Sequence, residues 1–182
     1  MANLFSKQYN KRTRFTRMCI GEAVFALMDQ KEYCAIKVSD IVKKAGVSRM
    51  TFYHYYESKE EALTDYFHEI VSGYIRECIA RKNTIKDFRD KASIVHALKY
   101  FDQYAVFILK MVHAKLYHII IDAMNNYMKN RIILHNPSLA YELYFYGGAL
   151  LNVFIMWEEN GKKESAKEIA EKISESMKLK DH

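Results

Sequence analysis

The chain has one Pro and six Gly among its 182 residues, and this scarcity excludes most all-β folds. A β-sandwich or barrel needs a turn about every 8–12 residues, and turns are built mainly from these two residue types. Half of the residues are hydrophobic, so the chain can form a sizeable core. We therefore expect an all-α protein of about nine helices, with boundaries marked by capping residues.

Paired cysteines and common catalytic motifs are also missing. The three cysteines, Cys19, Cys34 and Cys78, are odd in number and lack C-x-x-C spacing. We expect reduced thiols, with no disulfide and no metal site. The sequence contains no P-loop, no G-x-S-x-G and no H-E-x-x-H. We therefore expect a protein that is not an enzyme and has no cofactor.

Long hydrophobic segments are absent too. No run of 18 apolar residues occurs, and the residues from Met1 to Arg17 lack the hydrophobic stretch of a secretory signal. We expect a soluble, cytoplasmic protein that does not enter a membrane.

The excess positive charge lies in the first third of the chain. From Met1 to Tyr56, 10 Lys and Arg residues stand against 4 Asp and Glu, whereas the remainder has 18 of each kind. Such an asymmetry indicates an anionic partner bound at one end. The alternative is a charged face that only keeps the protein soluble.

The segment from Val38 to Lys59 has the pattern of a helix-turn-helix. Ser39 is placed to cap a short helix that ends near Ala45. Gly46 supplies a left-handed stop, and Ser48 caps a second helix only two residues later. Two short helices joined by such a turn form DNA-binding heads. Packed helix pairs of this shape also occur in proteins that never bind DNA.

The second helix of this pair carries side chains that suit double-stranded DNA. They offer a guanidinium, a hydroxyl, an imidazole and phenols, which bind phosphates or base edges. The basic N-terminal arm and the N-terminus of this helix add positive potential. We expect DNA contacts from Lys11, Arg12, Lys37, Ser48, Arg49, Met50, Thr51, Tyr53, His54 and Tyr55.

The run from Ala45 to Leu63 and the upstream Ile20–Ala23 resemble the signature of TetR-family transcriptional regulators. The resemblance covers residues 12–66 and implies a homodimer whose two helix-turn-helix heads grip an operator. It also implies a helical C-terminal region that dimerises and, in many members, holds an effector.

The resemblance also assigns roles to individual residues. It implies that Thr51, Tyr53 and Tyr55 face DNA. It further implies that Lys59 contacts a backbone phosphate. The chain departs from the family pattern at Tyr56, where Phe is usual.

We expect two domains, with residues 1–57 binding DNA and residues 58–182 forming a helical domain for dimerisation and effector binding. One capping box, Ser58 to Glu61, opens the second domain, and another, Ser165 to Glu168, opens the last helix. The helices expected between them are Ser58–Arg81, Phe88–Phe101, Tyr104–Val112, Ala114–Asn130 and Pro137–Glu159.

Two adjacent glycines, Gly147 and Gly148, lie inside the last of these helices. Each costs about 1 kcal/mol in an isolated helix, and close approach of another helix is a physical reason for them. Stripes on the last two helices would then form a four-helix dimer interface, unless both stripes are intramolecular core. The expected interface residues are Tyr141, Phe145, Gly148, Asn152, Ile155, Ile169 and Ile173.

Aromatic and His residues are dense between Tyr100 and His118. They could line a pocket for a small hydrophobic effector, or they could fill the core as rings at helical spacing usually do. His113 and His118 are five residues apart and do not share one helix face, so we expect no metal site there. The residues expected to line the pocket are Tyr100, Tyr104, Phe107, His113, Tyr117 and Phe145.

Together these patterns predict a sequence-specific transcriptional repressor that binds a two-fold-symmetric operator as a homodimer. A small hydrophobic effector is expected to release it from DNA. The alternative is a TetR-like regulator or coactivator that is controlled by a protein partner and has no small-molecule ligand. A hollow C-terminal domain favours the first function, and a packed one favours the second.

Overall fold

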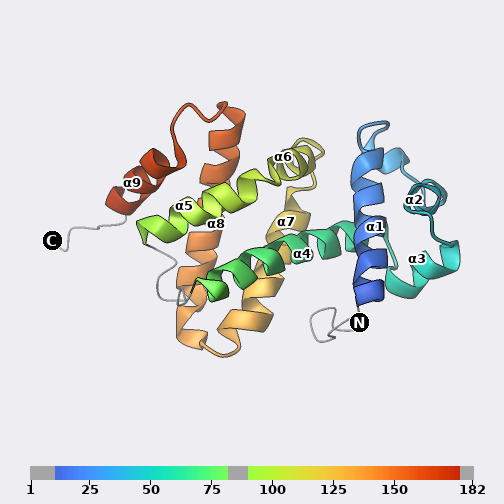
Figure 1. Cartoon of the computed structure of the whole chain (residues 1–182), viewed down its shortest axis with the longest axis horizontal. Helices are drawn as coiled ribbons and strands as arrows, with labels where there is room; N and C mark the ends of the chain where they lie inside the picture. Colours follow the sequence, from blue (N-terminus) through green and yellow to red (C-terminus); the bar gives the residue numbers. More distant parts are fainter. Residues whose placement is uncertain (1–10, 82–89, 177–182) are drawn as a thin grey trace. The chain divides into compact units, whose positions relative to one another are not determined.

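The computed structural model describes residues 11–81 and 90–176, and within these ranges it is helical with no strand (Figure 1). The expected all-α fold is confirmed. The described helices are α1 (Lys11–Leu27), α2 (Val38–Ala45), α3 (Arg49–Tyr55), α4 (Lys59–Ala80), α5 (Lys91–Asp102), α6 (Ala105–His113), α7 (Tyr117–Met128), α8 (Ala140–Glu159) and α9 (Ala166–Ser176). The connections between these helices contain two short 3-10 turns, at Tyr33–Ala35 and Pro137–Leu139, and a π-helical segment at Lys129–Ile133.

Several helix boundaries follow the caps expected from the sequence. The Ser48 hydroxyl accepts the Thr51 backbone N–H at 3.0 Å at the start of α3. Gly46 ends α2 with a φ of 67°, in the left-handed region that favours glycine. At α9 the predicted capping box is confirmed, because Ser165 and Glu168 each accept the backbone N–H of the other.

The predicted cap of α2 is wrong. This helix begins at Val38, so Ser39 lies inside its first turn. The side chain that caps it belongs to Asp40, whose carboxylate accepts the Lys37 backbone N–H at 3.1 Å. Hydrogen bonds from the Lys31 side chain and the Lys37 backbone lower the pKa of the Asp40 carboxyl. A carboxylate in the first helical turn is also favoured by the helix dipole.

Boundaries in the second half of the chain are less well predicted. Asp90 accepts the Ser93 backbone N–H at 2.8 Å, and α5 therefore begins at Lys91. The Pro137 turn is 3-10, so α8 begins only at Ala140, not at Pro137. Residues 82–89, which include the expected start of the helix Phe88–Phe101, lie outside the described residues.

The chain divides into two compact units that do not follow the predicted boundary at residue 57. Among the described residues, the head unit comprises 11–71 and 111–138, and the C-terminal unit comprises 72–81, 90–110 and 139–176. The first half of α4 thus belongs with the helix-turn-helix, and the same helix continues into the C-terminal unit. The loop before Ser58 separates helices but does not separate compact units.

In the head unit, α1, α2 and α3 enclose a small apolar core (Figure 1). Its fully buried members include Ile20, Ile41 and Phe52, one from each helix. Gly21 lets α4 approach α1, because a Cβ atom at this position would lie 2.6 Å from the Cβ of Tyr66. These contacts fix the direction in which α3 faces solvent.

Acidification is expected to destabilise the head unit through His68. Burial lowers the pKa of this imidazole to about 4, below its ordinary 6.5, and its Nε2–H donates to the Ala123 carbonyl at 3.1 Å. The stability contributed by neutral His68 is therefore complete above about pH 6.5 and is lost as the pH falls toward 4. Urea unfolding between these pH values should show a weaker pH dependence for His68→Gln, which keeps a donor, than for wild type. Equal dependence would contradict this account.

In the C-terminal unit, α5 packs against α9 (Figure 1) and contacts α8 through an aromatic pair. Phe101 and Phe154 meet edge to face, with ring centroids 6.5 Å apart. The Trp157 indole N–H donates to the Glu164 carbonyl at 2.7 Å, which ties the α8–α9 connection to α8. On α9, Ile169 is only 5% exposed, so its assignment to the dimer interface is corrected: it is core of its own subunit.

One helix among the described residues is long and apolar enough to cross a membrane by composition. This segment, Pro137–Glu159, has a mean hydropathy of 1.3, although it contains no uninterrupted apolar run of 18 residues. Only 17% of it is buried within the chain. The helix therefore presents a large apolar surface that its own subunit leaves uncovered.

Candidate nucleic-acid interface

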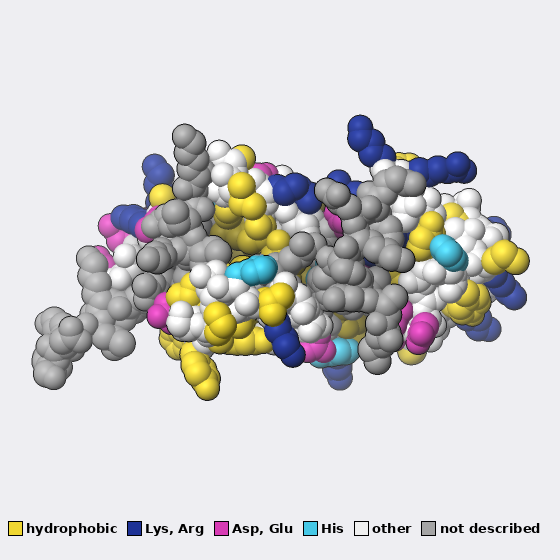
Figure 2. Space-filling view, turned by 90° about the horizontal axis from the view of Figure 1, so that it is seen from below, with side chains coloured by type: hydrophobic (Ala, Val, Ile, Leu, Met, Phe, Trp, Pro, Cys, Tyr) yellow, Lys and Arg dark blue, Asp and Glu magenta, His cyan; other side chains and the backbone are white. Residues whose placement is uncertain are grey.

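The exposed face of α3 carries the side chains expected to read DNA. Phe52 is buried and anchors the helix, which turns the opposite face outward. Met50 is 83% exposed and Tyr53 is 60% exposed, and Arg49 and His54 are exposed beside them. Lys and Arg side chains project from the surface around α2 and α3 (Figure 2). The base contacts of these residues stay predictions.

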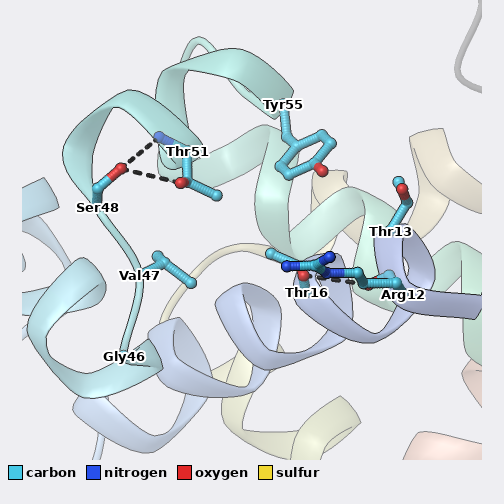
Figure 3. Close-up of a pocket in the computed structure, with 8 residues that line it drawn as sticks. All are labelled: Arg12, Thr13, Thr16, Gly46, Val47, Ser48, Thr51 and Tyr55. Atoms are coloured by element: carbon cyan, nitrogen blue, oxygen red, sulfur yellow. Dashed lines mark hydrogen bonds between the residues drawn. The ribbon is translucent and has the colours of Figure 1, made fainter.

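A polar cleft of about 520 Å³ lies between α1 and the turn that precedes α3 (Figure 3). It combines one guanidinium with hydroxyl groups and a phenol. The Ser48 and Thr51 hydroxyls lie 2.9 Å apart, and the Thr16 hydroxyl donates to the Arg12 carbonyl at 3.1 Å. This donor set suits a phosphate group. The lining residues are Arg12, Thr13, Thr16, Gly46, Val47, Ser48, Thr51 and Tyr55.

Sequence reasoning placed Arg12, Ser48, Thr51 and Tyr55 at the DNA surface, and the structure brings these four together in the cleft. It missed the α1 threonines that complete the lining. The available signal was the spacing of Thr16, which follows Arg12 by four residues and Thr13 by three.

The basic arm is only partly available to a ligand. The Arg14 Nε atom donates to Glu69 at 2.8 Å, and Arg17 forms a buried ion pair with Asp65. Lys11 and Arg12 are exposed, and their DNA contacts stay predictions.

Lys59 has an internal role that its family position did not predict. Its ammonium donates to the backbone carbonyls of Tyr33 at 2.6 Å and Ile36 at 3.1 Å. It also lies 4.3 Å from the centroid of the Tyr33 ring. Lys59 thereby fastens the connection between α1 and α2 to the start of α4. Its phosphate contact stays a prediction, as does that of the exposed Lys37.

The network behind α3 includes the residue at which the chain departs from the family pattern. The Tyr56 hydroxyl donates to Asp65 at 2.6 Å, and the other carboxylate oxygen of Asp65 accepts from Arg17. Burial, and then the charge of Asp65, raise the pKa of the Tyr56 phenol. Tyr56 therefore stays a hydrogen-bond donor and joins the end of α3 to α4.

The predicted interface residues of α8 lie mostly on its uncovered surface. Tyr141 is 91% exposed, Phe145 is 69% exposed and Asn152 is exposed, whereas Gly148 and Ile155 are half-buried. Hydrophobic side chains reach the surface over the part of the chain that includes α8 (Figure 2). The sequence analysis missed two further exposed apolar residues of α8, Tyr144 and Met156.

The residues expected to line an effector pocket do not share one environment. Tyr100 and Phe107 are buried in the C-terminal unit, where the Tyr100 ring packs against its neighbours Tyr74 and Phe101. Tyr104 and Tyr117 are half-buried, whereas His113 and Phe145 are exposed. Tyr100 and Phe107 are therefore core residues, and the effector pocket stays a prediction.

Comparison with known proteins agrees with this geometry. Residues 20–64 match the family "Bacterial regulatory proteins, tetR family", and residues 90–179 match "Transcriptional regulator C-terminal region". The chain is 38% identical over 58 residues to the uncharacterised HTH-type transcriptional regulator YxbF of Bacillus subtilis. It is 39% identical over 54 residues to DhaS, an HTH-type transcriptional activator of the dhaKLM operon in Lactococcus lactis. These matches span 31% and 30% of this chain, but only 15% and 29% of the two relatives.

Two solved structures share the fold. One is the dihydroxyacetone kinase operon activator DhaS, with a TM-score of 0.55, 22% identity and coverage of 89% of this chain and 93% of the other. The second is the fatty acid degradation regulator FadR from Bacillus halodurans, with a TM-score of 0.57, 18% identity and coverage of 97% and 100%. TetR-family regulators act on transcription by binding DNA and are not enzymes. The chain belongs to the TetR family and is a transcriptional regulator with a DNA-binding helix-turn-helix.

Proposed function

We propose that the chain represses transcription by binding a two-fold-symmetric operator as a homodimer. The observation that supports this proposal is that the exposed face of α3 lies beside the polar cleft that contains Arg12. This surface offers groups for base edges and, next to them, groups for the phosphate backbone. A DNA target also supports the proposal that the protein acts in the cytoplasm.

The proposed dimer forms through the uncovered face of α8. Tyr141 and Phe145 are the most exposed apolar residues of this helix. A second copy can cover the same face by two-fold symmetry, because each patch then packs on its equivalent. We favour this arrangement over contact of α8 with a membrane. A dimer that binds an operator needs an interface patch on each subunit, because this interface fixes the distance between the two DNA-binding heads at about 34–36 Å.

The direct test is selection from a pool of random DNA duplexes by the purified protein. We expect enrichment of one sequence with two-fold symmetry and half-sites about one helical turn apart. Failure to enrich any sequence would contradict DNA recognition. Enrichment of an isolated half-site would contradict the dimer but not the contact surface.

Two arginines at the head allow a matched prediction. Arg12→Ala should weaken binding to all duplexes alike and reduce the slope of log affinity against log salt by about 1, because one phosphate contact is lost. Arg49→Ala should instead change the preferred base at one operator position, where discrimination falls by about 1–3 kcal/mol. Fluorescence anisotropy with the selected operator and its single-base variants measures both effects. Each variant removes one positive charge, so a uniform loss for both would contradict the separate roles.

Control by a small hydrophobic effector remains our first proposal for regulation. The second candidate, control by a protein partner, is favoured by the packed Tyr100 ring cluster. A thermal-shift screen of apolar aromatic compounds, followed by DNA-release assays, separates the two. Compounds that stabilise the protein and release DNA support the effector, whereas their absence favours the partner.

A further inference from the structure

A thiol, an imidazole and a carboxylate lie in line in the C-terminal unit. The Cys78 sulfur is 3.8 Å from Nδ1 of His96, and Nε2 of His96 is 2.9 Å from a Glu77 carboxylate oxygen. Glu77 and Cys78 stand near the end of α4, and His96 stands on α5. In such an arrangement a nucleophile is hydrogen-bonded to a base, and the base is hydrogen-bonded to a group that orients it. This arrangement activates a side chain for covalent chemistry.

The imidazole of this group is held in a fixed position. The His96 side chain is only 6% exposed, and the Tyr74 ring stacks on it with centroids 5.3 Å apart. The Glu77 carboxylate is half exposed, so it faces both the imidazole and solvent. Within the described residues, no group of three or more His, Cys, Asp or Glu is arranged to hold a metal ion. The arrangement therefore requires an explanation other than metal binding.

Proton positions follow from the two contacts of His96. Glu77 accepts the Nε2–H, which leaves Nδ1 as the acceptor that faces the thiol. Burial raises the pKa of the Cys78 thiol, while a hydrogen bond with Tyr74 and the charge of Arg81 act in the opposite direction. A thiol that stays protonated at neutral pH reacts well only if a neighbouring base removes its proton. His96 is that base.

We propose that Cys78 is a nucleophilic thiol, activated by His96 and Glu77, that adds to small α,β-unsaturated carbonyl compounds. His96 Nδ1 takes the thiol proton as the sulfur attacks the β-carbon, so an S–C bond forms and the C=C π bond breaks. The imidazolium then protonates the α-carbon, which regenerates neutral His96. Overall, the S–H bond and the π bond of the C=C are broken, and one S–C bond and one C–H bond are formed. No oxidant or reductant takes part.

A conjugated carbonyl suits the surroundings of the thiol. The rings of Tyr74, Tyr100 and Phe101 pack together beside His96, with centroids of neighbouring pairs 5.2–5.4 Å apart. Such rings favour a flat, apolar molecule over a charged or strongly hydrated one. Cys78 itself is half-buried, so a small reagent is the size that can reach it.

The chain carries its own controls, because Cys34 is exposed and Cys19 is half-buried like Cys78. Accessibility alone would make Cys34 react first. The proposal predicts the opposite order. With N-ethylmaleimide as the probe and the full-length native protein at pH 7, peptide mass spectrometry should find Cys78 modified about tenfold faster than Cys34 or Cys19. A positioned base contributes about 10²–10⁴-fold, and the partial burial of Cys78 reduces this advantage to about tenfold.

Two variants test the mechanism. His96→Gln should slow modification of Cys78 about tenfold or more and leave the rate at Cys34 unchanged. Glu77→Gln keeps a hydrogen-bond acceptor for the imidazole but removes the negative charge of the carboxylate. Because position 77 is half-exposed, the variant should fold, and it should slow the modification of Cys78 several-fold. Faster labelling of Cys34 than of Cys78 in the wild-type protein would overturn the proposal. An unchanged rate of Cys78 modification in both variants would also overturn it. If His96→Gln fails to fold, the comparison of Cys78 with Cys34 in the wild-type protein decides alone.

Discussion

Replacing Asp65 with Ala is expected to lower the free energy of unfolding by about 3–5 kcal/mol, the usual effect of breaking a buried ion pair. Arg17 and Asp65 are each about 5% exposed, and the Arg17 guanidinium donates to one carboxylate oxygen. Without Asp65 the guanidinium stays buried without its counter-charge. Urea unfolding followed by circular dichroism at neutral pH measures the loss.

Two further variants separate charge from packing at this site. Tyr56→Phe removes only the hydroxyl that donates to Asp65 at 2.6 Å and should lower the free energy of unfolding by about 1.5–3 kcal/mol. The double variant Arg17→Met with Asp65→Leu removes both charges and should recover most of the stability lost in Asp65→Ala. A loss below about 1 kcal/mol for Asp65→Ala would show that the pair is not an essential link between α1 and α4.

Replacing Gly148 with Leu is expected to convert the proposed dimer into a folded monomer. A Cβ atom at Gly148 would meet no heavy atom of the rest of its subunit within 4 Å, so the subunit itself has room for the side chain. Leu also favours the helix over Gly by about 1 kcal/mol. Light scattering coupled to size exclusion at micromolar concentration should give the dimer mass for wild type and the monomer mass for the variant.

Two controls make this result specific to the α8 face. Lys99→Leu adds the same side chain at an exposed position of α5 and should leave the mass unchanged. Gly73→Ala should instead destabilise the subunit, because a Cβ atom there would collide with the Tyr100 hydroxyl. A dimer mass for Gly148→Leu would place the interface elsewhere, and a monomeric wild type would remove it.

The parts of the fold that the sequence predicts well depend on local chemistry. Gly46 ends α2 through its own backbone angle, and Ser48 caps α3 through the N–H three residues ahead. Neither feature depends on distant residues, so both can be predicted from the sequence. Ser39 failed because α2 begins one residue earlier, at Val38, where the Asp40 carboxylate accepts the Lys37 backbone N–H. Either polar residue can mark a helix start, and the sequence does not rank them.

The rest depends on residues that only the fold brings together. Lys59 meets carbonyls more than 20 positions earlier in the chain, and Cys78 meets an imidazole 18 positions later, with no motif spacing to mark either contact. Helical periodicity predicted an apolar face around Tyr100 but could not decide between core and pocket. The same periodicity does not separate Ile169, which is core, from Phe145, which is exposed.

The regular register of α4 inside the C-terminal unit restricts how the chain can change length. Each residue of an α-helix turns the next side chain by about 100° and advances it by about 1.5 Å. A single-residue insertion between Tyr74 and Cys78 would therefore rotate either the Tyr74 ring or the Cys78 thiol away from His96, without changing any side chain. Natural variants of this protein should keep that interval fixed while their connecting loops differ in length.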